Sequence, residues 1–406
     1  MITAQIDLGL VLNPASAPRT AAPAGPFTAD GFASAATHIA AMPSYAPTPL
    51  HDLSALAAQC DVGAVLYKDE GERFGLGSFK PLGAPYAAAN ALAEKLAPHH
   101  PAKSHAELLA GIVRGSYAAD LANLTLVSAT DGNHGRALSW AAQQFGAKAH
   151  IFAHDGMSDG RREAITALGA TLTICPGGYD DSVRKAFAYG AQTGSPVIQD
   201  TAAGDYRAVP EAITYGYGTI ASEVVGALHA PPTHAIVQAG VGGVASAICA
   251  AFWHHYGADR PRFIVLEPVT AACVAASLAA GCPVTVPGDT QTAMAGLACG
   301  TVSDLAWEVL HTGADAALIV PDRLAFEGMR ALATPHGNDP ALVGGECAGG
   351  AVGALLALSK RPDLRAALGL DAQARVFLLG TEGATDASLY EEIVGRAPES
   401  VMSAAA

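Results

Sequence analysis

Lys80 is the residue whose type and setting point most directly to covalent chemistry. It stands in FGLGSFKPLGA (residues 74–84), after two glycines, a serine and a phenylalanine, and directly before Pro81. Proline favours the first turn of a helix, so we expect Lys80 at a helix start, close to main-chain N–H groups. The positive end of the helix dipole disfavours a protonated amine there, which predicts a nucleophilic amine. An exposed lysine at the start of a helix is the alternative interpretation.

A second glycine-containing turn, SATDGNHG (128–135), lies where a predicted strand gives way to a helix. Gly132 and Gly135 flank Asn133 and His134. Such a turn presents backbone donors and an amide to an anionic ligand. The alternative is a plain loop in which Asp131 or Asn133 caps the helix.

The third turn, AGVGGVAS (239–246), has the glycine spacing that lets main-chain N–H groups approach a phosphate. Gly240, Gly242 and Ala245 also match the dinucleotide pattern G-x-G-x-x-A, with Glu267 at the end of the next predicted strand. That pattern alone is weak, so phosphate binding is favoured over NAD binding.

The fourth turn, LLGTEGATD (378–386), ends a predicted buried strand in Thr381. Its hydroxyl either caps a helix or faces a ligand. In an α/β fold, ligands bind at the carboxyl ends of strands, where all four turns are expected.

Predicted strands and helices alternate along the chain, which is typical of βαβ units and a parallel sheet. Residues 1–45, rich in alanine and proline, are expected to form an irregular arm with short ordered pieces. We therefore predict an α/β fold of two lobes, each an open, parallel-rich sheet flanked by helices. The predicted strands are 62–70, 124–130, 148–154, 170–177, 196–200, 234–240, 262–268 and 374–380; the predicted helices are 85–97, 134–146, about 161–169, 181–194, 243–257 and 270–281.

Composition excludes several classes of function. The 406-residue chain is half hydrophobic with a formal charge of −14, which argues against a nucleic-acid partner. No secretory signal is recognisable at the start, and the apolar stretch 348–358 is too short to span a bilayer, so we expect no membrane partner.

The cysteines and histidines indicate neither a disulfide framework nor a metal site. The seven cysteines contain no C-x-x-C pair, which predicts mostly reduced thiols and a cytoplasmic location, although a Cys273–Cys299 pair stays open. The histidine pairs at 99–100 and 254–255 lack metal-ligand spacing.

Together the motifs resemble the fold type II pyridoxal-phosphate enzymes, the tryptophan synthase β family. Within that group the chain resembles the diaminopropionate ammonia-lyases, and the resemblance runs from about residue 28 to the C-terminus. The segments that carry it are ERFGLGSFK (72–80), ATDGNHGRALSWAA (129–142), IQDTAAGDY (198–206), VQAGVGG (237–243), AMAGLACG (293–300) and GTEGATD (380–386).

The resemblance implies how a pyridoxal 5'-phosphate cofactor is held. Lys80 would bind its aldehyde as a Schiff base and move the substrate Cα proton. Asn133 would bind its phenolic oxygen, and Thr381 would face its pyridine nitrogen. The residues implied to cradle its phosphate through main-chain amides are Gly240, Val241, Gly242, Gly243 and Val244.

The resemblance also implies a reaction. Ammonia is eliminated from 2,3-diaminopropionate through an aminoacrylate, which hydrolyses to pyruvate and a second ammonia. Asp131 resembles the acid–base residue on the opposite cofactor face, needed for the D-isomer. Asp200 resembles the aspartate that holds the amino groups of this small amino-acid substrate.

Expected assembly and domain organisation come from the same source. A homodimer is implied, with a large cofactor-binding domain of residues 1–85 and 216–406, including the arm 1–45. Residues 86–215 would form a small domain on the substrate side.

Departures from the family pattern leave the substrate open. Gly77 and Ser78 replace an expected asparagine–alanine pair, and Ala203 and Gly204 replace a bulky aromatic residue. A dehydratase acting on a 3-hydroxy amino acid is the nearest rival. A β-replacement transferase, an NAD-dependent oxidoreductase and a non-catalytic regulatory protein are more distant alternatives.

Overall fold

The computed structural model describes residues 7–130, 132–334 and 337–402, which fall into two compact units. The first unit contains the described residues of Met1–Ala29, Thr48–Glu72 and Ile220–Ala406. The second contains Asp30–Pro47 and Arg73–Thr219. Residues 30–47, 73–85 and 216–219, assigned above to the large domain, thus cluster with the second unit. The division into a cofactor-binding and a substrate-side domain stays a prediction.

The first unit is built on a seven-stranded sheet with the order β1-β9-β8-β7-β10-β3-β2. The inner strands, β9 to β3, run parallel, and the edge strands β1 and β2 pair antiparallel with their neighbours. Parallel pairing places the carboxyl ends of the inner strands at one edge of the sheet. The strands are β1 Gly9–Leu12, β2 Leu50–Asp52, β3 Ala64–Asp69, β7 His234–Gln238, β8 Arg262–Pro268, β9 Ala316–Val320 and β10 Arg375–Gly380.

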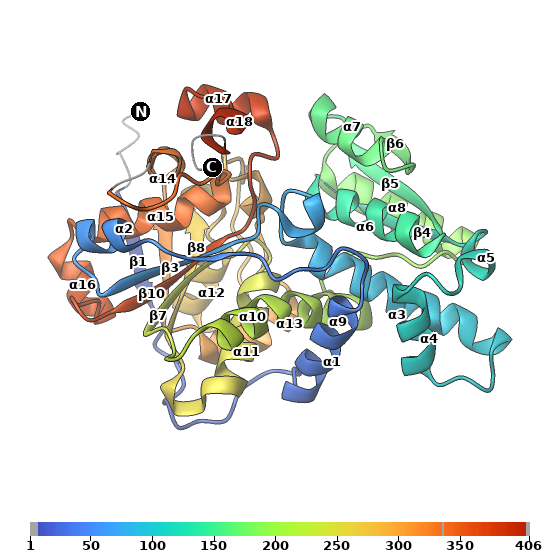
Figure 1. Ribbon diagram of the computed structural model, residues 1–406, viewed down its shortest axis with the longest axis horizontal. Helices are drawn as coiled ribbons and strands as arrows, with labels where there is room; N and C mark the ends of the chain where they lie inside the picture. The colour runs from blue at the N-terminus through green and yellow to red at the C-terminus, as the bar shows by residue number, and fades with distance from the viewer. Residues whose placement is uncertain (1–6, 131, 335–336, 403–406) are drawn as a thin grey trace. The chain divides into compact units, whose positions relative to one another are not determined.

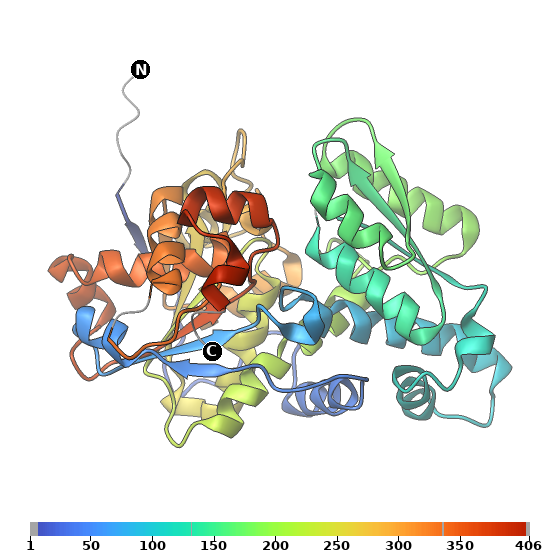
Figure 2. The ribbon, with the colours of Figure 1, turned by 45° about the horizontal axis from the view of Figure 1, so that its top comes forward.

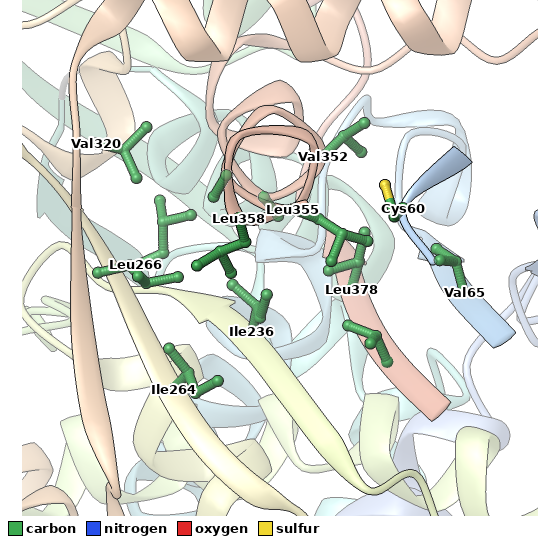
Figure 3. Packing of buried hydrophobic residues seen from close by; sticks show 14 of the residues in the cluster. Cys60, Val65, Ile236, Ile264, Leu266, Val320, Val352, Leu355, Leu358 and Leu378 are labelled. Carbon is green, nitrogen blue, oxygen red and sulfur yellow. The ribbon is translucent and has the colours of Figure 1, made fainter. Parts of the chain in front are cut away.

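Helices cover both faces of this sheet, because its inner strands are apolar on both sides (Figure 1). Helix α15 (Glu346–Leu358) packs on one face, where Leu355 and Leu358 join Ile236 and Leu378 in the largest core cluster (Figure 3). Helix α11 (Gly243–Tyr256) packs on the other face, with the rings of Phe252 and Phe377 5.5 Å apart. Full burial of each such side chain contributes about 1.5–3 kcal/mol.

Glycines in α15 permit close helix packing in the first unit. A Cβ atom on Gly353 would lie 1.8 Å from the carbonyl oxygen of Leu324 in helix α14 (Asp322–Ala333). The apolar stretch 348–358 is therefore a buried core helix. None of the helices described is long and apolar enough to cross a membrane.

The second unit contains a three-stranded parallel sheet of β4 (Thr125–Ala129), β5 (Lys148–His154) and β6 (Thr171–Cys175). Helices α6 (Asn133–Phe145) and α8 (Tyr179–Thr193) pack alongside it (Figure 2). Its small core includes Val127, Phe152 and Ala186.

The fold class predicted from the sequence is confirmed, and most predicted elements are present within a few residues of their expected ends. The prediction for residues 196–200 is wrong, because this segment makes only an isolated bridge between Val127 and Val197. The prediction of an irregular arm over residues 1–45 is also wrong in part, since α1 (Ala29–Ala40) is a regular helix that buries Phe32 and Ile39.

The remaining elements are shorter or peripheral. The other α-helices are α2 Ser54–Gln59, α3 Ala84–Leu96, α4 His105–Val113, α5 Ala118–Leu121, α7 Asp159–Thr166, α9 Ala208–Tyr217, α10 Thr219–Ala227, α12 Cys273–Ala280, α13 Asp304–Gly313, α16 Pro362–Leu368, α17 Ala387–Val394 and α18 Pro398–Met402. The 3₁₀ turns are η1 Arg73–Gly75, η2 Lys80–Leu82, η3 Ala97–His99, η4 Gly257–Asp259, η5 Val269–Ala271 and η6 Ala295–Leu297.

Candidate active site

Lys80 lies at a helix start in the second unit, as predicted from Pro81. It is the first residue of η2, with Pro81 second, and α3 follows at Ala84. Gly77, three residues earlier, has a φ of 75°, a left-handed conformation that favours glycine. This turn delivers the amine to Asp200: Lys80 Nζ donates a hydrogen bond to Asp200 Oδ2 at 2.7 Å.

The charge state of Lys80 differs from the sequence-based expectation. Burial lowers the pKa of its ammonium, but the Asp200 carboxylate outweighs burial and raises that pKa above its ordinary value. Burial likewise raises the pKa of Asp200, yet the Lys80 ammonium outweighs burial and holds that pKa below its ordinary value. The prediction of an amine deprotonated by the helix start is therefore wrong for this pair, which is an ammonium–carboxylate ion pair.

Aromatic rings complete the surroundings of the amine within the second unit. Lys80 Nζ lies 5.4 Å from the ring centre of Phe79 and 5.8 Å from that of Tyr217, distances typical of cation–π contacts. The two rings meet edge to face at 4.8 Å. Tyr217 ends helix α9 and was not singled out from the sequence, because nothing local marks it.

The turn between β4 and α6 is held by one hydroxyl. Thr130 Oγ1 accepts hydrogen bonds from Gly132 N at 3.0 Å and Gly135 N at 3.1 Å. Asn133 is the first residue of α6, whose cap position is Gly132, so Asn133 does not cap the helix. Its half-buried amide has no hydrogen-bond partner in the part of the chain described and is available to a ligand. Asp131, the predicted second acid–base residue, lies outside the described residues.

In the first unit, the turn after β7 forms a cradle of main-chain donors at the start of α11. Gly242 has a φ of 93°, and a Cβ there would lie 2.8 Å from Ala306 Cβ, so only glycine fits. The N–H groups of residues 240–244 donate no hydrogen bond to any residue that the structure describes. Such a row of donors at the start of a helix is suited to a phosphate.

Glu267 does not serve as a ribose-binding acid beside this cradle. Its carboxylate accepts hydrogen bonds from Val274 N and Ala275 N, each at 2.7 Å, and so holds the start of α12. Burial raises the pKa of Glu267 to about 7. The dinucleotide interpretation thus loses its acidic residue.

Thr381 directly follows β10 and is 2% exposed. Its Oγ1 is buried without a hydrogen-bond partner among the residues described. The following helix, α17, is capped by Asp386, whose side chain accepts from Leu389 N at 3.2 Å. The capping alternative for Thr381 is therefore wrong, and its hydroxyl is free for a ligand.

The cysteines are reduced in this structure. All seven cysteines are free, including Cys273 and Cys299. No group of histidine, cysteine, aspartate or glutamate side chains able to hold a metal occurs within residues 7–130, 132–334 and 337–402.

Comparisons with known proteins agree with this arrangement. Residues 41–379 match the family described as "Pyridoxal-phosphate dependent enzyme". The chain is 39% identical over 356 residues to a diaminopropionate ammonia-lyase of Escherichia coli K12, covering 86% of this chain and 87% of the relative. A Salmonella typhimurium protein of the same name is also 39% identical, over 363 residues, 87% of this chain and 89% of the relative. The crystal structure of the Escherichia coli enzyme with an aminoacrylate–PLP azomethine intermediate has a TM-score of 0.86 and 34% identity, covering 96% of this chain and 97% of that one.

Proposed function

The chain belongs to the family of pyridoxal-phosphate-dependent enzymes and, within it, to the diaminopropionate ammonia-lyases; from this premise we propose how its residues eliminate ammonia from 2,3-diaminopropionate. The products are pyruvate and two molecules of ammonia. The cofactor is pyridoxal 5'-phosphate, which supplies the electron sink that stabilises a carbanion at Cα.

The residues present fit this cofactor. The unpaired N–H groups of residues 240–244 are assigned to its phosphate, and the unpartnered Oγ1 of Thr381 to its pyridine nitrogen. A hydroxyl at that nitrogen, in place of a carboxylate, would leave it largely unprotonated and so would favour elimination. The free amide of Asn133 is assigned to the phenolic oxygen, and the Lys80 amine to the aldehyde.

The observation that carries the proposal is the 2.7 Å contact between Lys80 Nζ and Asp200 Oδ2. A primary ammonium on a flexible carbon chain is the chemical group that the substrate presents at Cβ. Asp200 already binds such a group, with its carboxylate ionised. We assign Asp200 to the substrate ammonium, which replaces Lys80 as its partner.

Release from Asp200 also changes what Lys80 can do. Without the carboxylate, burial is the largest influence left on the ammonium and lowers its pKa, so Nζ becomes able to accept a proton. Neutral Lys80 Nζ then takes the Cα proton of the L-isomer. Asp131 is assigned to the same task for the D-isomer, from the opposite face.

Two further parts of the proposal rest on the sequence: the homodimer on the family resemblance, and the location on the cysteine pattern. We propose that the chain acts as a homodimer and resides in the cytoplasm. Sedimentation of the purified protein, with its mass read against that of one 40.9 kDa chain, tests the first.

The experiment that tests the function compares Lys80→Ala with Lys103→Ala, an exposed lysine on the same unit. The Lys103 variant should keep the visible absorbance of bound cofactor and release pyruvate from 2,3-diaminopropionate. The Lys80 variant should lose both. Full pyruvate release by Lys80→Ala would reject the assignment of Lys80 as the base.

A further inference from the structure

His134 is buried beside the Lys80–Asp200 pair, and its ring is held in one tautomer. The residue is 5% exposed, and its Nε2 lies 2.7 Å from the carbonyl oxygen of Ile198. A carbonyl oxygen only accepts, so Nε2 carries the hydrogen. Burial lowers the pKa of the imidazole, which keeps the ring neutral. Nδ1 therefore presents a lone pair.

That lone pair faces an acceptor. His134 Nδ1 has no hydrogen-bond partner among the described residues, and it lies 3.9 Å from Asp200 Oδ2. Two acceptors cannot bond to each other, and a buried polar atom without a partner is costly. A cation with several N–H donors would satisfy both atoms. Lys80 already places one such cation 2.7 Å from the same carboxylate oxygen.

The supports around the pair fix this geometry. Ile198 O also accepts a hydrogen bond from Ser128 Oγ at 2.8 Å, which anchors the carbonyl that orients the ring. The side-chain oxygen of Gln199, the residue between Ile198 and Asp200, accepts a hydrogen bond from Ala129 N at 3.1 Å. The segment carrying Asp200 is thus tied to β4, and the two acceptors are preorganised.

We propose that His134 Nδ1 and Asp200 Oδ2 form a two-acceptor subsite for the substrate's Cβ ammonium, and that this subsite selects an amine over a hydroxyl as the leaving group. The inference rests on the proposed function and names the residue that makes the leaving group specific. His134 touches the leaving group and not the Cα proton.

The chemistry of elimination explains the selection. The Cα–H electron pair forms the Cα–Cβ double bond, the proton goes to Lys80 Nζ, and the Cβ–N bond breaks with its electron pair on nitrogen. An ammonium group then departs as neutral ammonia, and needs no proton from the subsite. A hydroxyl would depart as hydroxide unless a donor protonated it, and neither Nδ1 nor an ionised Asp200 carries a proton.

Two variants of His134 separate this role from a structural one. His134→Gln keeps a side-chain N–H that can reach Ile198 O, but removes the acceptor at the Nδ1 position. His134→Asn keeps an acceptor near that position and loses the bond to Ile198. Steady-state kcat/KM is measured for 2,3-diaminopropionate and for serine with the cofactor-loaded wild type and both variants, and folding is checked by circular dichroism.

The subsite predicts opposite behaviour of the two variants. His134→Gln should lower kcat/KM for 2,3-diaminopropionate by about ten- to a hundredfold, the value of one hydrogen bond to a charged group, with little change for serine. His134→Asn should retain most of the preference for the amine. Equal losses on both substrates, or a greater loss of preference in His134→Asn, would overturn the proposal.

A spectroscopic measurement stands apart from activity. In protein labelled with ¹⁵N-histidine, two-bond ¹H–¹⁵N spectra should show His134 protonated at Nε2 and unprotonated at Nδ1, the signal being assigned by its loss in either variant. A proton on Nδ1 would overturn the subsite even if a variant failed to fold. If the wild type releases no pyruvate from 2,3-diaminopropionate, the proposed function fails instead, whatever the tautomer.

Discussion

Asp200→Asn isolates the charge that holds Lys80. The substitution keeps the size of the side chain and removes the counter-charge 2.7 Å from Nζ. Burial is then the largest influence on the ammonium, so the pKa of Lys80 should fall and a larger fraction of the amine should be neutral at any given pH.

The partial exposure of the Lys80–Asp200 pair determines how much Asp200→Asn lowers the free energy of unfolding. Breaking a fully buried ion pair costs about 3–5 kcal/mol, whereas an exposed pair contributes about 0.2–1 kcal/mol. The side chains of Lys80 and Asp200 are 25% and 16% exposed, so water reaches both. We therefore expect Asp200→Asn to lower the free energy of unfolding of the second unit by about 2 kcal/mol.

The sign of the pH dependence follows from the two shifts. Folding lowers the pKa of Asp200, so its contribution to folding stability is present above its pKa in the unfolded chain. That contribution is lost as the pH falls through its pKa in the folded protein. The pKa of Lys80 is raised, so its contribution is present below its unfolded pKa and lost at higher pH. The penalty of Asp200→Asn should be constant from about pH 5 to pH 9 and shrink outside that window.

Competitive acetylation of the cofactor-free protein, read by peptide mass spectrometry, measures the neutral fraction of each lysine. Lys80 should react faster in Asp200→Asn than in the wild type. The matched control is Glu107→Gln, which removes the charge from the exposed Lys103–Glu107 pair, 3.3 Å apart, and should change Lys103 little. Unchanged reactivity of Lys80 in Asp200→Asn would refute the idea that Asp200 holds its charge.

Three further predictions concern the first unit. Gly242→Ala should destabilise the fold by about 1–3 kcal/mol in chemical denaturation, because it combines a φ of 93° with a contact to Ala306, whereas Gly226→Ala, with open space around it, should not. Thr381→Val, nearly isosteric, should weaken cofactor binding about tenfold in a fluorescence titration and leave the melting temperature within a few degrees; unchanged affinity would contradict its assignment. Glu267 has a pKa of about 7 in the folded protein and near 4.3 in the unfolded chain, so it stabilises the folded state most below about pH 4 and loses this contribution as the pH rises to about 7. Glu267→Gln should therefore reduce the fall in melting temperature between about pH 4 and pH 7.

Local pattern predicted the inner architecture well. Strands buried on both faces, such as 262–268, read as continuous apolar runs and were identified with their ends. The edge strands β1 and β2 escaped prediction because they have only 4 and 3 residues. Helix α1 was not predicted because it lies in a segment rich in alanine and proline. Its apolar face is defined by a few buried residues, among them Phe32.

Long-range partners explain the errors at the site. The composition of 196–200 suits a strand, and its backbone bonds to Val127 of β4 through Pro196 O and Ile198 N. The pairing stops there, because Gln199 N donates to Tyr206 Oη at 2.9 Å instead. The charge state of Lys80 depends on Asp200, which is 120 residues away in sequence. No local reading of the helix start could include that carboxylate. His134 was visible in the motif, but its tautomer depends on the carbonyl of Ile198.

The stoichiometry of product release distinguishes an ammonia-lyase from a dehydratase. Purified, cofactor-loaded enzyme is incubated separately with 2,3-diaminopropionate and serine, and pyruvate and ammonia are assayed together. We expect two ammonia molecules for each pyruvate from 2,3-diaminopropionate, with a kcat/KM well above that for serine. A higher kcat/KM for serine, releasing one ammonia per pyruvate, would contradict this expectation and identify a dehydratase.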